Sequence, residues 1–324
     1  MKSVLEVAVG AVVDLHGKVL IAKRPDDKHQ GGLWEFPGGK IEPGETQRQA
    51  LDRELHEELA IDVKTATPLI TIHHDYPDLS VKLKVWRVDR FEGAPHGREG
   101  QAVEWVAPTD LQNYSFPAAN RPIVTALCLP PFYAILDDST PSALFSNLQT
   151  ILANGIKLIQ LRLKKVTAGE AAEFIARILP LCRRHGASLL LNSAVSGVEA
   201  SCVDGIHLTG KDLMALRERP DCQGWLAASC HNEAELRHAE TVGVDFAVLA
   251  PVLPTATHPG ARILGWQGFT ALAETANIPV FGLGGLTKDD QARVREAGGQ
   301  GVAGIRAFIE AETHPRSPAN VRKT

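Results

Sequence analysis

The feature that most constrains this chain is a glycine-rich loop followed by an acidic helical segment, over residues 37–61. Because glycine adopts turn conformations without steric cost, the glycines predict a tight loop, rather than a strand or a helix, over residues 37–44. Thr46 followed by Gln49 has the form of a capping box, which predicts that a helix begins there. The fold must therefore accommodate a loop-to-helix junction near residue 46.

The predicted helix has two distinct faces. An apolar stripe recurs every four residues and predicts the buried side: Leu51, Leu55 and Leu59. Glu54, Glu57 and Glu58 lie three and four positions apart, so their carboxylates share another face. Arg53 precedes Glu57 by four residues and can orient it through an ion pair.

Clustered carboxylates repel one another unless a cation lies among them. Mg²⁺ and Mn²⁺ take oxygen ligands and also bind phosphate oxygens. The loop and the acidic face therefore predict a metal-bound diphosphate, with a water molecule activated by metal or carboxylate for attack on phosphorus. The plain alternative is a solvated acidic helix face.

The spacing Gly-x5-Glu-x7-Arg-Glu-Leu-x-Glu-Glu-x-x-Ile, which begins at Gly39, resembles the Nudix box. Ala60 is a departure, since the family usually has glycine there, and it concerns the helix end rather than the chemistry. Further motifs extend the resemblance to the MutT-type 8-oxo-dGTP diphosphatases over residues 1–129: Arg24, 34–42, Glu104-Trp105 and 116–122.

The resemblance implies Mg²⁺- or Mn²⁺-dependent hydrolysis of a nucleoside triphosphate, 8-oxo-dGTP, to the monophosphate and pyrophosphate, which serves nucleotide-pool sanitation and DNA repair. It implies a catalytic and metal-binding group: Gly38 (backbone oxygen), Arg53, Glu54, Glu57, Glu58 and Glu104. It also implies a group that lines the nucleotide pocket: Arg24, His29, Glu35, Phe36, Pro37, Gly38 and Asn120.

Asn120 has a physical rationale for recognition of the oxidised base. Oxidised guanine carries a hydrogen on N7, where ordinary guanine has a lone pair. A carboxamide can donate to O6 and accept from this N7–H, whereas ordinary guanine would set acceptor against acceptor. Such a mismatch gives strong discrimination in a buried pocket. The alternative for Asn120 is a capping residue before a helix.

Composition places the chain among ordinary globular proteins, and 324 residues suffice for two domains. A net charge of -4 gives no reason to expect duplex nucleic acid or an anionic membrane as a partner. The five cysteines form no Cys-x-x-Cys pair and are expected to be reduced thiols in a cytoplasmic protein. Residues 4–13 are apolar but short, and we expect a strand there rather than a signal peptide or a membrane span.

Two α/β domains are predicted on either side of a double proline that ends at Pro131. Residues 1–129 should form an α/β/α sandwich, with strands at 4–13, 18–23, 68–74, 79–91 and 103–106 and a helix at 122–127. Residues 130–311 should form a compact (β/α)8 TIM barrel, with strands at 132–136, 157–161, 188–191, 205–208, 225–228, 246–249, 280–283 and 301–305. Residues 312–324 are expected to be a disordered tail.

Residues 132–308 resemble the thiamine phosphate synthase and thiazole tautomerase (TenI) family through the motifs at 160–164, 204–208, 251–257 and 282–286. The resemblance implies a phosphorylated thiazole or pyrimidine ligand. It also implies a set of ligand residues that follow the strands: Lys164, Asn192, Asp212, Ser229, His231, Thr255, Gly284 and Gly285.

The barrel departs from the synthase pattern in three places. Ser193 replaces an Asp that helps to hold Mg²⁺, His258 replaces a Lys that contacts the diphosphate, and Arg306 replaces a small residue. These changes favour a phosphate-binding remnant over a working synthase. Alternatives stay open: a thiamine-pathway diphosphate as the Nudix substrate, tautomerase activity through His231, or a barrel that senses a ligand or acts as a scaffold.

Overall fold

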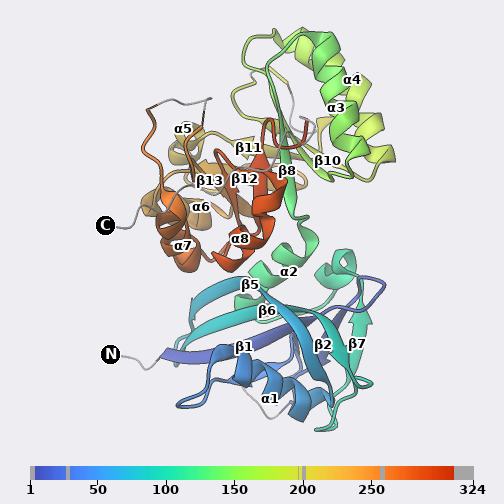
Figure 1. Cartoon of the computed structure of the whole chain (residues 1–324), viewed down its shortest axis with the longest axis vertical. Helices are drawn as coiled ribbons and strands as arrows, with labels where there is room; N and C mark the ends of the chain where they lie inside the picture. Colours follow the sequence, from blue (N-terminus) through green and yellow to red (C-terminus); the bar gives the residue numbers. More distant parts are fainter. Residues whose placement is uncertain (1–3, 27–29, 196, 199–201, 256–259, 310–324) are drawn as a thin grey trace, which may run out of the picture.

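The computed structural model describes residues 4–26, 30–195, 197–198, 202–255 and 260–309. Two β-sheets with their helices form the N-terminal part, and a closed parallel barrel forms the C-terminal part (Figure 1). The predictions for His29, His258 and the tail 312–324 lie outside the described residues.

The N-terminal part contains seven strands in two sheets. The strands are β1 (Val4–Val12), β2 (Val19–Lys23), β3 (Trp34–Glu35), β4 (Gly38–Lys40), β5 (Asp62–Asp75), β6 (Ser80–Glu92) and β7 (Val103–Val106). One sheet has the order β4-β1-β6-β5 and the other the order β3-β2-β7. Strand β1 pairs in parallel with β6 and antiparallel with β4, so the sheet is mixed, as predicted.

Helices cover both sides of this part. Helix α1 (Gln47–Leu59) buries its leucine stripe against residues of β1 and β2, which confirms the predicted face. On the other side, η1 (Pro108–Asn113), η2 (Ala118–Asn120) and α2 (Arg121–Cys128) contribute to a second core with β1, β5 and β6. The predicted sandwich is therefore present.

Two details of the prediction are wrong. Gly38–Lys40 forms strand β4 rather than a loop, because a backbone without Cβ can approach β1 very closely: a Cβ on Gly38 would lie 2.1 Å from the Ala8 carbonyl oxygen. Strand β5 begins at Asp62 rather than at Pro68. It is the edge strand of its sheet, and an edge strand tolerates a proline without an N–H.

All eight predicted barrel strands are present and close in parallel order. They are β8 (Phe132–Asp137), β9 (Leu158–Arg162), β10 (Ser188–Asn192), β11 (Gly205–Leu208), β12 (Trp225–Cys230), β13 (Phe246–Leu249), β14 (Val280–Leu283) and β15 (Gly301–Gly304). The helices between them are α3 (Pro141–Ala153), α4 (Ala168–Arg184), α5 (Gly210–Ala215), α6 (Glu233–Val242), α7 (Gly265–Thr275), η4 (Lys288–Asp290) and α8 (Gln291–Glu296).

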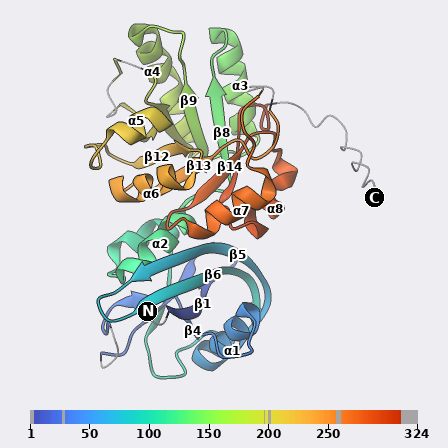
Figure 2. The same cartoon turned by 90° about the vertical axis from the view of Figure 1, so that its left-hand side faces the viewer.

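The sandwich meets the barrel at the end where the barrel strands begin. The His73 amide of β5 donates to Asn277 Oδ1 at 2.7 Å, and Asn277 lies just before β14. Helix α2 lies at the same junction (Figures 1 and 2). In a (β/α)8 barrel, ligands bind at the opposite end, where the strands finish. None of the described helices is long and apolar enough to cross a membrane.

Candidate active site

The start and the end of α1 follow from local sequence. The Gln49 amide donates to Thr46 Oγ1 at 3.3 Å and the Thr46 amide donates to Gln49 Oε1 at 2.9 Å, which confirms the predicted capping box. At the other end, Ala60 takes the left-handed conformation with φ 57°, where the family resemblance leads one to expect glycine. These two caps determine where α1 begins and ends, and thereby where Glu54, Glu57 and Glu58 lie along the helix.

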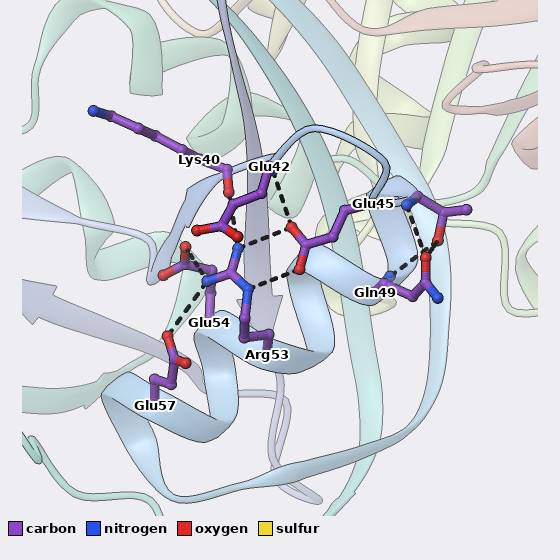
Figure 3. Close-up of polar contacts among 8 residues, drawn as sticks. Lys40, Glu42, Glu45, Gln49, Arg53, Glu54 and Glu57 are labelled. Atoms are coloured by element: carbon purple, nitrogen blue, oxygen red, sulfur yellow. Dashed lines mark hydrogen bonds and ion pairs between the residues drawn. The ribbon is translucent and has the colours of Figure 1, made fainter.

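Arg53 joins the glycine-rich loop to the acidic helix (Figure 3). Its guanidinium donates to both oxygens of Glu45 at 2.7 and 2.9 Å, to Glu54 at 2.7 Å and to the Lys40 carbonyl at 3.0 Å. The predicted ion pair with Glu57 is also present, at 3.3 Å. Hydrogen bonds from Arg53 lower the pKa of Glu45 to about 2, so Glu45 stays ionised. Arg53 thereby holds Glu54 and Glu57 beside the loop.

Glu58 lies on the inner side of the same face. The Gly38 amide donates to Glu58 Oε2 at 3.0 Å. Burial, with a smaller contribution from the negative charges of Glu35 and Glu54, raises the pKa of Glu58 to about 8. Strand β4 packs tightly against the helix here, because a Cβ on Gly39 would lie 2.2 Å from the Glu54 carboxyl carbon. Only glycine fits at position 39 with Glu54 in this place.

The donor set fits a hard divalent cation in its chemistry. It consists of carboxylate oxygens, and the pKa of Glu58 is raised mainly by burial and, to a lesser degree, by the negative charges of Glu35 and Glu54. Within the described part of the chain, however, no three Asp, Glu, His or Cys side chains lie in an arrangement that would hold a metal ion. Glu104 comes from β7 and accepts a hydrogen bond from the Tyr114 hydroxyl at 2.6 Å.

Of the residues predicted to bind the nucleotide, Arg24 directly follows β2, Glu35 ends β3, and Phe36 and Pro37 follow it. Arg24 forms an ion pair with Glu35, and burial raises the pKa of Glu35 in spite of this partner. Phe36 is buried and stacks on Phe116, with ring centroids 5.4 Å apart. The Pro37 carbonyl accepts from the Gly10 amide at 2.8 Å. The structure thus pairs Arg24 with Glu35 and ties the segment to β1.

Asn120 is 8% exposed and lies at the start of α2. Its side chain does not cap that helix, so the capping alternative is wrong. No other described residue forms a hydrogen bond with this carboxamide. The polar atoms of this carboxamide still reach solvent, so they are open to water or to a ligand.

Sequence reasoning missed Tyr76, which lies between β5 and β6. Burial raises the pKa of Tyr76, while a hydrogen bond with the Ala119 backbone and the charge of Arg24 oppose this shift. Tyr76 therefore lies near both Arg24 and the residue that precedes Asn120. Its position between the two strands predicted only a turn, and the contacts arise from tertiary folding.

A chain of polar side chains runs through the barrel beneath the predicted ligand site. Asn192 donates to Gln160 at 2.8 Å, and Gln160 donates to the Tyr133 hydroxyl at 3.3 Å. His207 continues the chain, with Nδ1 3.0 Å from the Tyr133 hydroxyl and Nε2 2.8 Å from Ser229 Oγ. Burial lowers the pKa of His207 to about 3, so the ring is neutral. The chain connects the predicted residues Asn192 and Ser229.

The Asp212 carboxylate does not fit the Mg²⁺ site of a synthase. Its Oδ2 accepts from the Ser193 hydroxyl and from the Thr209 hydroxyl, the latter at 2.7 Å. These hydrogen bonds lower the pKa of Asp212. One oxygen of the carboxylate is thus bonded within the protein, and Ser193 brings a hydroxyl where a second carboxylate would be needed.

The other predicted ligand residues of the barrel lie at the ends of its strands. His231 Nδ1 lies 2.9 Å from Glu235 Oε2, in a contact that sequence reasoning missed. The Lys164 amide donates to Asp138 at 2.8 Å, and its side chain is exposed. Thr255 follows β13. Gly284 and Gly285 follow β14 with φ of 105° and 66°, which only glycine adopts readily.

Comparison with known proteins gives a family match for the N-terminal part and another for the barrel. The family model of the NUDIX domain matches residues 8–126, and that of thiamine monophosphate synthase matches residues 132–308. The chain belongs to both families. Its N-terminal part is a Nudix hydrolase, fused to a barrel that resembles thiamine phosphate synthase.

Similar proteins are known for each part. An 8-oxo-dGTP diphosphatase of Escherichia coli is 40% identical over 38% of this chain and 95% of its own length. A CTP pyrophosphohydrolase of the same organism is 39% identical over 36% of this chain and 87% of its own length. A putative thiamine-phosphate synthase 2 of Aquifex aeolicus is 31% identical over 56% of this chain and 99% of its own length.

Proposed function

We propose that the Nudix part, residues 1–129, hydrolyses 8-oxo-dGTP to 8-oxo-dGMP and pyrophosphate and so removes an oxidised nucleotide before it enters DNA. The observation that carries this proposal is the carboxamide of Asn120, a residue only 8% exposed, whose side chain does not cap α2 and whose polar atoms are open to a ligand. Such a group matches the O6 acceptor and N7–H donor of the oxidised base. Similar proteins act on either 8-oxo-dGTP or CTP by name, and Asn120 favours the purine.

The reaction needs water to attack phosphorus while the P–O bond that joins the nucleoside monophosphate to the pyrophosphate group breaks. A Mg²⁺ or Mn²⁺ ion bound by Glu54, Glu57 and Glu58, with Gly38 and Glu104 as further ligands, would stabilise charge on the phosphate oxygens. Arg53 orients two of these carboxylates, and the Gly38 amide orients the third. A carboxylate of the cluster accepts the proton that the water loses.

We propose that Arg24, His29, Glu35, Phe36 and Pro37 complete the nucleotide site. The Arg24–Glu35 ion pair supports this proposal, because the charge of this guanidinium acts on Tyr76, which is hydrogen-bonded to the backbone of Ala119 beside Asn120. Phe36 is buried against Phe116, and the partly exposed ring of Phe116 gives an aromatic surface of the kind on which a base can stack.

For the barrel, residues 130–311, we propose binding of a phosphorylated thiazole or pyrimidine without synthase activity. Two observations support it. One oxygen of Asp212 accepts from two hydroxyl groups and Ser193 brings no carboxylate, so the Mg²⁺ of a synthase would have too few carboxylate ligands here. Gly284 and Gly285 keep the backbone conformation of a loop that can present amides to a phosphate.

The proposed hydrolysis is tested by pyrophosphate or phosphate release from 8-oxo-dGTP, dGTP, CTP and thiamine diphosphate, each with Mg²⁺ and with Mn²⁺. The Glu57→Gln variant provides the background rate. We expect the highest kcat/KM for 8-oxo-dGTP. If kcat/KM is higher for CTP or for thiamine diphosphate, that compound is the substrate and not 8-oxo-dGTP. The assignment of Nudix hydrolysis would stand in either case.

A further inference from the structure

Gln300 is a barrel side chain that bonds to the Nudix part. It is 1% exposed and lies immediately before β15. Its Nε2 donates to the Ala126 carbonyl and to the Leu129 carbonyl, both at 3.0 Å. Its own backbone amide donates to the Val280 carbonyl at 2.7 Å, which anchors it on β14. Both hydrogens of one barrel amide thus bind the end of helix α2.

The C-terminal end of α2 lacks a backbone hydrogen-bond donor because a proline follows it. In a continuing helix the Ala126 carbonyl would accept from the amide of residue 130. Residue 130 is Pro130, which has no N–H. The last carbonyls of a helix otherwise rely on caps or water, and a buried carbonyl without a partner is costly. Gln300 replaces the donor that the proline removes.

The other end of α2 carries Asn120. The helix is only eight residues long and begins directly after Asn120. Its inner face is buried through Ile123, Ala126 and Leu127 in the core that β5 shares. Strand β5 is itself bonded to the barrel through His73 and Asn277. A shift of the helix end at Gln300 would therefore be passed along one short rigid element to the recognition amide.

We propose that Gln300 is a positioning residue for base recognition: through it the barrel fixes helix α2, and thereby the Asn120 carboxamide, in the Nudix part. This inference rests on the proposed function of Asn120. It gives the barrel a role in the hydrolase that needs no chemistry at the barrel's own ligand site.

The test uses the full chain with Gln300→Met, which keeps the length of the side chain and removes its hydrogen-bond donor. We measure kcat/KM for 8-oxo-dGTP and for dGTP, and hydrogen exchange of the α2 amides relative to those of α1. Because small misplacements of a recognition group cost up to about 10²-fold, we expect the ratio of the two kcat/KM values to fall about tenfold. The loss should appear mainly in KM for 8-oxo-dGTP, and the α2 amides should exchange faster.

Two further variants separate positioning from loss of stability. Ile151→Ala removes a fully buried side chain of α3, in the barrel but not at the junction, and should leave the ratio unchanged. Gln300→Asn keeps the amide but shortens it, and should cause a smaller loss than Gln300→Met. If Gln300→Met does not fold, Gln300→Asn decides by the same two measurements.

The outcomes distinguish the inference from the proposed function. A wild-type ratio near one would overturn the function of Asn120, and the exchange of α2 would then still report whether Gln300 holds the helix. A high wild-type ratio that Asn120→Ala reduces and that neither Gln300 variant changes would overturn the positioning role alone. Unchanged exchange of α2 in both Gln300 variants would also overturn it.

Discussion

Arg53 determines how the acidic residues of α1 are arranged. One guanidinium contacts three carboxylates, of which Glu54 and Glu57 come from the helix and Glu45 from the loop before it (Figure 3). Glu58 is excluded from this set and is bonded instead by the Gly38 amide. At the scale of single residues the site therefore has two kinds of carboxylate, three held by a guanidinium and one held by a backbone N–H.

This arrangement predicts that each of Glu54→Gln, Glu57→Gln and Glu58→Gln lowers kcat by about 10²-fold or more, since each removes an oxygen ligand or a base. The measurement is pyrophosphate release at saturating Mg²⁺ by variants whose folding is verified by circular dichroism. Asp52→Asn is the matched control, because Asp52 is an acid of the same helix that pairs only with Arg48 in the described structure. Normal turnover by all three Glu variants would refute the assignment.

Local spacing allowed part of this site to be predicted. The Arg53–Glu57 pair could be read from an i, i+4 spacing, and the capping box from Thr46 and Gln49. Glu45 and Tyr76 were not predicted as site residues, because their partners depend on the path of a loop and on the packing of a hairpin. Those contacts are tertiary and leave no periodic signal in the sequence.

At the scale of elements, prediction succeeded where a strand buries a short apolar run. All eight barrel strands were found in this way, since each is apolar and is bounded by turns or helices. Strand β4 was missed because its glycines predict a turn, although they are needed for close approach to β1. The early start of β5 was missed because Pro68 is compatible with a strand only at the edge of a sheet.

The polar chain across the barrel strands predicts a pH effect on stability. Burial lowers the pKa of His207 below its unfolded value of about 6.5, so the folded state is favoured above that pH and loses stability as the pH falls toward 3. Between pH 7.5 and pH 5 the loss should be about 2 kcal/mol. Urea unfolding of the full chain at both pH values measures it. His207→Gln, which cannot titrate there, should lose less; an equal loss would show that other groups are responsible.

The arrangement at the ends of the barrel strands predicts ligand binding without synthesis. The full chain carrying Glu57→Gln, which prevents hydrolysis by the Nudix part, should form no thiamine phosphate from the pyrimidine diphosphate and the thiazole phosphate. Calorimetry with the thiazole phosphate should show saturable binding that Lys164→Ala weakens. Lys165→Ala is the control, since Lys165 is the adjacent exposed lysine. Robust synthesis would contradict the role given to Asp212, and absence of binding would leave the barrel without a ligand.

At the scale of the whole molecule, the barrel contacts the Nudix part through the end where its strands begin. The opposite end, where barrels bind their ligands, points away from this junction (Figures 1 and 2). The two candidate sites therefore do not face each other, and direct transfer of a product between them is not expected. The two parts are joined by hydrogen bonds, since α2 and β5 are both bonded to barrel side chains.

The central claim is that Asn120 makes this Nudix hydrolase selective for an oxidised purine nucleotide. The most direct measurement is the ratio of kcat/KM for 8-oxo-dGTP to kcat/KM for dGTP, in the wild type and in Asn120→Ala. We predict a large ratio in the wild type, and a loss of roughly 1–3 kcal/mol of discrimination in the variant, with metal dependence unchanged. A wild-type ratio near one, or a large ratio that Asn120→Ala leaves intact, would contradict the claim.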